Sequence, residues 1–203
     1  MKIHSDSFQH RQRIPVEFAA GQPTADGYGF APNRNPHLAW SDVPQGAQSF
    51  ALLCIDPDVP TDISPAQIPV EQPRTDFTHW VMVDIPADVR ELAAGSCSDG
   101  VVPRGKGAPN GPAGSRQGLN DYTGWFANDA DMRGDWRGYD GPFPPPHDLR
   151  LHRYFFRVFA LDVARLALPE RFTTSDVLQA IHGHVLGEAS IYGTYSLNPA
   201  VKD

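Results

Sequence analysis

The sequence has little cysteine, no excess of basic residues and no long apolar run, and each of these shortages excludes a class of protein. Two cysteines in 203 residues, Cys54 and Cys97, are too few for a disulfide-built scaffold. No segment approaches the ~18 consecutive apolar residues of a membrane-spanning helix, and the N-terminal residues lack the apolar centre of a signal peptide. We therefore expect a cytoplasmic protein without a membrane span.

The charge balance excludes further partners. The chain carries 17 Lys and Arg residues against 24 Asp and Glu residues, which gives a formal net charge of −7. A net acidic chain is a poor binder of phosphate backbones, so neither nucleic acid nor an anionic membrane surface is an expected partner.

Glycine and proline, by contrast, are abundant. The 18 Gly and 20 Pro residues make 38 of the 203 positions, whereas the average share is ~12%. Both residues disrupt helix interiors, which excludes a helical bundle. Hydrophobic residues make up 40% of the chain, which is enough for a core. A chain of this length usually forms one domain, so we expect a single domain over residues 1–203.

Short apolar runs bounded by turn residues predict a mostly β protein. The strongest strand signals are Ser49–Ile55, His79–Ile85 and the aromatic-rich Tyr154–Leu161, followed by Ile191–Leu197. Two weaker candidates are Ile14–Ala19 and Leu38–Trp40.

One pattern predicts a helix near the C-terminus, over Thr174–Glu188. A hydroxyl residue at its start, such as Thr173, can cap it. Five apolar residues of this segment fall on one face at helical spacing: Val177, Leu178, Ile181, Val185 and Leu186. One or two further helical turns are expected within Asp88–Ala94.

A long segment rich in Gly, Pro, Asp, Asn and Arg occupies about residues 96–151. Loops beyond ~12–15 residues are usually functional or disordered. This segment contains six aromatic residues: Tyr122, Trp125, Phe126, Trp136, Tyr139 and Phe143. Because disordered linkers are poor in aromatic residues, we expect an ordered loop packed against the rest of the molecule.

Asp56-Pro57-Asp58-Val59-Pro60 directly follows the first buried strand. Two interpretations stay open here. Asp and Pro are common in strand-ending turns, and the same residues form a rigid corner of the kind on which sites are built.

Two histidines stand at ends of predicted strands. His79 opens the second strand and His152 immediately precedes the third. Most histidines in such positions are ordinary surface residues, but with Asp56 these two could meet at one rim. A carboxylate beside an imidazole fixes its tautomer and raises its basicity. Such a rim could bind an anion, ligate a metal or move protons.

The segment Gly141–Pro146 lies just upstream of His152 and has few backbone donors, so we interpret it as a rigid pocket wall. Other motifs fail on inspection. Gly105–Gly111 lacks the third glycine of a dinucleotide fingerprint. Asp129–Asp140 begins like a calcium loop, but Arg133 stands in place of an oxygen ligand. The Gly-x-Ser-x-Gly elbow of serine hydrolases does not occur.

Together these motifs resemble the phosphatidylethanolamine-binding protein family, in its bacterial Raf-kinase-inhibitor-like branch. The family's Asp-Pro-Asp-x-Pro turn and His-aromatic strand start match Asp56–Pro60 and His79-Trp80. Its Gly/Pro-rich wall before His-Arg-Tyr matches Gly141–Pro146 and His152-Arg153-Tyr154. The resemblance covers roughly residues 49–198.

The resemblance implies a β-sandwich with a large central antiparallel sheet, a smaller second sheet and a C-terminal helix. It also implies a small rigid pocket that accepts an anionic group, such as phosphate or a phospholipid head group. The ligand-binding residues carried over by match are Asp56, Pro60, His79, Pro145, His152 and Tyr154. The supporting residues are Asp58, Trp80, Pro144 and Arg153. Phe143, where eukaryotic members carry a small residue, and the long loops would narrow the pocket mouth.

We therefore expect a non-enzymatic binding protein for a small anionic ligand, with a possible regulatory role. One alternative is an inhibitor that binds a kinase or protease through its surface. The other is an enzyme that uses the Asp–His rim for acid–base chemistry, which ranks last because no activated nucleophile accompanies the rim. The implied family role needs no metal or cofactor, and we expect none. A homodimer is expected, because bacterial relatives are often dimers.

Overall fold

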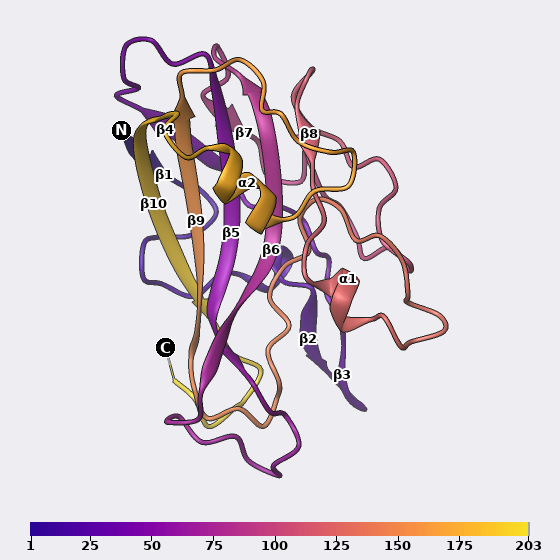
Figure 1. The fold of residues 1–203 in the computed structure, drawn as a ribbon. Helices are drawn as coiled ribbons and strands as arrows, with labels where there is room; N and C mark the ends of the chain where they lie inside the picture. The colour runs from indigo at the N-terminus through magenta and orange to yellow at the C-terminus, as the bar shows by residue number, and fades with distance from the viewer. Residues whose placement is uncertain (203) are drawn as a thin grey trace.

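The structure, a computed structural model, describes residues 1–202. Its main feature is a five-stranded antiparallel sheet with the strand order β10-β9-β5-β6-β8 (Figure 1). The strands are β5 (Ser49–Pro60), β6 (Arg74–Pro86), β8 (Arg116–Gln117), β9 (His152–Leu161) and β10 (Val185–Tyr195). Three of the four long strands contain the strongest predicted ones, and β10 overlaps the fourth prediction, Ile191–Leu197, up to Tyr195, so the mostly β fold is confirmed.

Two smaller sheets accompany the large one. The first has the order β1-β4-β7 and consists of Lys2–His4, Leu38–Ser41 and Glu91–Leu92. The second is a hairpin of β2 (Gly21–Thr24) and β3 (Gly27–Phe30). The helices are short: the 3-10 helix η1 (Val16–Phe18), α1 (Tyr122–Trp125) and α2 (Thr174–Ala180).

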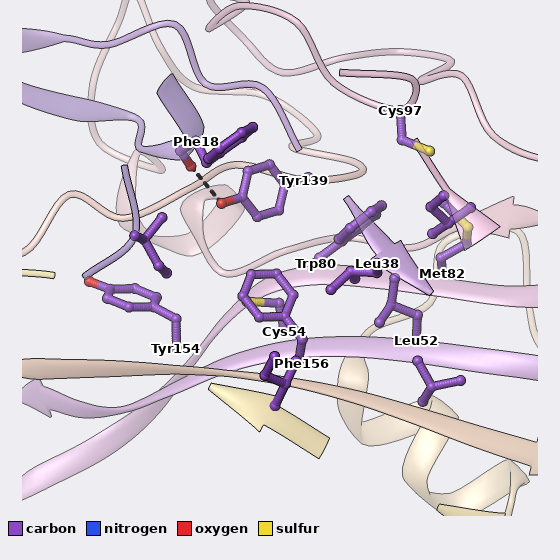
Figure 2. Packing of buried hydrophobic residues seen from close by; sticks show 14 of the residues in the cluster. Phe18, Leu38, Leu52, Cys54, Trp80, Met82, Cys97, Tyr139, Tyr154 and Phe156 are labelled. Atoms are coloured by element: carbon purple, nitrogen blue, oxygen red, sulfur yellow. Dashed lines mark hydrogen bonds between the residues drawn. The ribbon is translucent and has the colours of Figure 1, made fainter. Parts of the chain in front are cut away.

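The two faces of the large sheet bury two separate hydrophobic clusters. Alternate residues of β9 point to opposite faces, as the strand geometry requires. Tyr154, Phe156 and Val158 face the main cluster, which Trp40 of β4 and Tyr139 of the long loop help to close. Figure 2 shows this cluster, in which the Tyr139 hydroxyl donates to the carbonyl oxygen of Phe18 over 2.6 Å. Phe159 and Leu161 face the second cluster, beneath α2.

The predicted C-terminal helix is too long and is not terminal. Thr173 caps α2 through a reciprocal capping box with Asp176, but the helix ends at Ala180. Gly183 has a φ of 82°, which ends the helical path, and β10 starts two residues later. Val185 and Leu186, predicted on the helix face, are exposed residues of β10. The helix therefore connects β9 to β10.

Of the two weaker strand candidates, Leu38–Trp40 is confirmed as part of β4. The other strand candidate and the short helix were wrong. Ile14–Ala19 is not a strand, because Pro15 precedes the 3-10 turn of η1. Asp88–Ala94 contains no helix and instead supplies β7. The long loop over residues 96–151 packs against the molecule as predicted, with Trp136 and Tyr139 almost fully buried. Within residues 1–202 no helix is long and apolar enough to cross a membrane.

Candidate functional site

The Asp-Pro-Asp corner is a bulge inside β5 and not a turn after it. Asp56 pairs with Phe77 and Val59 with Thr75 on β6, and the register shifts between these two pairs. The backbone N–H of Asp58 donates to Asp56 Oδ1 over 2.8 Å, which stiffens the bulge. The Asp56 and Asp58 side chains are both almost fully buried and bind different partners.

His152 lies between two carboxylates and is fully buried. Its Nδ1 is 2.6 Å from Asp56 Oδ2 and its Nε2 is 3.0 Å from Asp148 Oδ2. Burial alone would lower the pKa of His152, but the hydrogen bonds to Asp148 and Asp56 raise it to about 9. His152 is therefore an imidazolium at neutral pH, and both of its N–H groups donate to protein carboxylates. The assignment of His152 as a ligand-binding residue stays a prediction.

Arginines complete this network of alternating charges. Arg74 binds Asp148 with two guanidinium nitrogens, and hydrogen bonds from His152 and Arg74 lower the pKa of Asp148 to about 2 against the opposing effect of burial. Asp58 accepts hydrogen bonds from Arg153 and Arg150, which lower its pKa despite burial. The network joins β5, β6, β9 and the segment before β9.

His79, at the middle of β6, is held in one tautomer. Its Nδ1 donates to the backbone carbonyl oxygen of Asp140 over 2.7 Å, and the Asp140 N–H donates back to the His79 carbonyl over 3.0 Å. Burial lowers the pKa of His79, although the charge of Asp56 partly opposes it. A neutral imidazole bonded through Nδ1 presents Nε2 as an acceptor. His79 is thus neutral at neutral pH.

Sequence analysis missed the anchor behind His79. The carboxylate of Asp140 is buried and binds Lys106 Nζ at 2.6 Å, Asn33 Nδ2 at 2.8 Å and Asn120 Nδ2 at 2.8 Å. Burial raises the pKa of Asp140, against the effect of Lys106. Asn33 is distant in sequence, and Lys106 and Asn120 come from earlier parts of the long loop, so no local pattern marked any of them. Asp148 was missed for the same reason.

A cavity of about 350 Å³ opens beside these residues. Its lining is mainly aromatic and proline side chains: Phe30, Asp56, Val59, Ile63, Phe77, His79, Tyr122, Trp125, Phe126, Phe143, Pro144, Pro145, Pro146, His147, His152 and Tyr154. The Tyr154 hydroxyl is buried and makes no hydrogen bond of full geometry within residues 1–202, although Asp56 is close enough to act as an acceptor. Burial, followed by the charge of Asp56, raises the pKa of Tyr154 well above its usual value, so the hydroxyl stays a donor.

The cavity contains five of the six residues predicted to bind a ligand. Pro60 is the exception, because it lies at the end of β5 opposite Arg74 and does not line the cavity. Of the supporting residues, Pro144 lines the cavity and Asp58 binds Arg153. Trp80 belongs to the main cluster, where its Nε1 donates to Gln117 Oε1 over 2.7 Å.

A model of the phosphatidylethanolamine-binding protein family matches residues 4–196, nearly the whole chain. The chain belongs to this family. It is 37% identical over 195 residues to a UPF0098 protein of Methanothermobacter thermautotrophicus, covering 96% of this chain and 98% of the relative. It is 33% identical over 196 residues to Escherichia coli YbhB, covering 97% of this chain and 100% of YbhB.

Solved structures agree with this assignment. The crystal structure of E. coli YbcL, described as a new member of the mammalian family, superposes with a TM-score of 0.70 at 25% identity. The match covers 96% of this chain and 97% of YbcL. A homologue from Chlamydia trachomatis gives a TM-score of 0.65 at 27% identity, over 100% of this chain and 97% of the homologue. The chain is therefore a binding protein of the UPF0098 type.

Proposed function

We propose that this protein is a non-enzymatic binding protein whose cavity holds a small phosphate monoester group as a monoanion. The observation that carries the proposal is that the Tyr154 hydroxyl, at the buried end of the cavity, makes no hydrogen bond of full geometry within residues 1–202. The ring centroids of Tyr154 and His79 are 5.1 Å apart, which is close enough for one small ligand to contact both side chains. Leaving a buried donor unsatisfied costs about 1–3 kcal/mol, which a bound acceptor recovers.

The charges of the lining favour a monoanion over a dianion. Neither Lys nor Arg lines the cavity, and Asp56 adds a carboxylate there. A dianion would meet this carboxylate, and the cation of the lining, the His152 imidazolium, is already paired with Asp56 and Asp148. A protonated phosphate has one P–OH group, which can donate to Asp56, and further oxygens, which can accept from Tyr154. His79 is able to join as acceptor or, once protonated, as donor.

Two features favour binding without catalysis. Cys, Ser, Thr and Lys are missing from the residues that line the cavity, so the lining offers no conventional side-chain nucleophile of these kinds. His152, the residue best placed for proton transfer to Asp56, has both ring nitrogens engaged. A group so held serves as a fixed charge.

Calorimetric titration with methyl phosphate tests the proposal. We expect Tyr154→Phe to lower the affinity by about ten- to a hundredfold, because it removes one hydrogen bond to a charged group worth about 1.5–3 kcal/mol. His79→Ala should also weaken binding. The matched control is His184→Ala, because His184 is a half-exposed histidine that binds Asp162 outside the cavity. Unchanged affinity in both cavity variants would refute the assignment.

The pH dependence provides a second check. The second pKa of a phosphate monoester is about 6, so the monoanion predominates below that pH. We expect the affinity for methyl phosphate to rise as the pH falls from about 8 to about 5.5, because the P–OH donor to Asp56 appears over this range. His152 does not contribute to this rise, because its pKa of about 9 keeps it protonated throughout. An affinity that falls over this interval would contradict the monoanion.

A further inference from the structure

The cavity has two chemically different ends. Its polar residues Asp56, His79 and Tyr154 are at most 3% exposed, whereas Phe30 and Trp125 are each 51% exposed. The outer end, here called the aromatic mouth, consists of five rings: Phe30, Phe77, Trp125, Phe126 and Phe143. The proposed phosphate site uses the buried end only, so the aromatic mouth is left without a role.

We propose that the aromatic mouth binds an aromatic ring carried by the same ligand, which makes the ligand an aryl phosphate monoester. This inference rests on the proposed function, because it needs the phosphate-type group at the buried end. Exposing large apolar side chains to water is unfavourable, and apolar rings gathered at a concave site are typical of ligand recognition.

The packing of the rings suits an aromatic partner. Phe77 and Trp125 meet at 6.3 Å between centroids and 77° between planes, and Phe30 and Phe143 at 6.2 Å and 84°. Both pairs pack edge to face, an arrangement that aromatic rings prefer. Because Trp125 and Phe30 are still half exposed, another ring can pack against each of them.

The charges at the aromatic mouth favour a neutral group there. Within the cavity lining, the carboxylate of Asp56 lies at the buried end, beside the His152 imidazolium. A cationic group at the mouth would lack a carboxylate partner. A second anionic group would lack a free cation, because no Lys or Arg of residues 1–202 lines the cavity and the His152 imidazolium is paired with Asp56 and Asp148. His147, also in the lining, uses its Nε2 on the carbonyl oxygen of Ile63 at 3.1 Å.

One wall of the aromatic mouth is rigid. Phe143 precedes three consecutive prolines, and its ring packs on the backbone of Gly21 in β2. A Cβ atom at residue 21 would come within 2.3 Å of the Phe143 ring, so only glycine leaves room for it. A wall that is already fixed loses little conformational entropy when a ligand binds.

Asp56 restricts the phosphate end of the ligand to a monoester. Its carboxylate can only accept hydrogen bonds, so the ligand must supply a donor there. A phosphate monoester monoanion has a P–OH group, whereas a diester has none. We therefore expect aryl monoesters to bind and diaryl diesters to be rejected.

The test compares phenyl phosphate, methyl phosphate, diphenyl phosphate and phosphocholine by calorimetry at about pH 5.5, where monoesters are mainly monoanions. Phenyl phosphate should bind about three- to tenfold more tightly than methyl phosphate, the gain expected from one aromatic contact. Trp125→Ala should abolish this gain and leave methyl phosphate binding unchanged. The matched control is Tyr28→Ala, because Tyr28 is 43% exposed on the same strand as Phe30 but does not line the cavity.

The outcomes separate the two proposals. Equal affinity for phenyl and methyl phosphate would overturn the aromatic subsite and leave the proposed function standing. If phosphocholine binds more tightly than phenyl phosphate, the aromatic subsite for a neutral ring is overturned, because the rings would then bind a cationic group. Binding of diphenyl phosphate would overturn the restriction to monoesters. If no phosphate ester binds, the proposed function fails and this inference fails with it.

Discussion

At the scale of single residues, the two cavity histidines behave in opposite ways although the sequence treats them alike. His79 is neutral because burial outweighs its weak electrostatic partners, and His152 is charged because two carboxylates contact its ring. The strand positions of both residues and of Asp56 were predictable, because apolar runs mark them. Their charge states were not, because Asp140 and Asp148 approach from a loop whose path has no periodic signal.

Asp56→Asn tests the charge on His152. The variant keeps the shape of the side chain but removes one of two charges that hold the imidazolium. We expect the pKa of His152, followed by NMR, to fall below its value of about 9. We also expect the free energy of unfolding to drop by about 3–5 kcal/mol, the usual cost of breaking a buried ion pair.

Asp162→Asn is the matched control for this variant. Asp162 accepts from His184 at 2.8 Å, but the two side chains are 44% and 43% exposed. An exposed pair contributes at most about 1 kcal/mol. Equal losses in unfolding free energy in Asp56→Asn and Asp162→Asn would show that burial does not increase the contribution of the His152–Asp56 pair to stability.

At the scale of elements, the long loop over residues 96–151 positions His79 in the cavity. Asp140 holds His79 through its backbone, and its own carboxylate is held by Lys106 from earlier in the same loop. The sequence predicted that this loop packs against the molecule because it is rich in aromatic residues. It could not predict the Lys106–Asp140 contact, because a pairing across 34 residues has no local pattern. The helix over Thr174–Glu188 was overpredicted for a related reason, since the pairing of Val185 with β9 overrides a helical spacing.

Lys106→Met tests the role of this anchor. The side chains of Lys106 and Asp140 are 10% and 1% exposed, so removing the cation leaves a buried carboxylate. We expect a loss of about 3–5 kcal/mol in unfolding free energy, together with weaker binding of methyl phosphate, because Asp140 fixes His79.

Two further variants make this result specific. The double variant Lys106→Met/Asp140→Asn should regain much of the stability, since replacing both charges of a buried pair is often neutral. Arg171→Met is the control, because Arg171 and its partner Asp135 are 61% and 40% exposed. Loss of stability without any change in ligand affinity would refute the positioning role.

At the scale of the whole molecule, the network around His152 joins segments that are distant in sequence. Asp56 lies on β5, Arg74 on β6 and His152 on β9, with Asp148 between the proline wall and β9. The mostly β architecture followed from the apolar runs, and the family resemblance implied a large antiparallel sheet, but neither gave the strand order β10-β9-β5-β6-β8. The predicted homodimer stays a prediction.

The pH dependence of global stability tests whether this network acts as a unit. The folded state raises the pKa of His152 from 6.5 to about 9. A raised pKa means that the folded state binds the proton more tightly, so the stabilisation is complete below pH 6.5 and is lost as the pH rises through 9. A shift of this size corresponds to about 3 kcal/mol. Asp148, with a pKa lowered to about 2, is ionised throughout this interval.

Urea unfolding at intervals between pH 6.5 and pH 9 measures the effect. We expect the free energy of unfolding to fall as the pH rises over this interval. His79 does not cause this fall: its pKa is lowered, so its contribution changes below pH 6.5 and with the opposite sign. Asp56→Asn should flatten the curve, because it reduces the shift in the pKa of His152, whereas Asp162→Asn should keep the slope of the wild-type protein. A wild-type stability that is constant over the interval would mean that His152 is not held as an imidazolium, even if the hydrogen bonds to Asp56 and Asp148 are present.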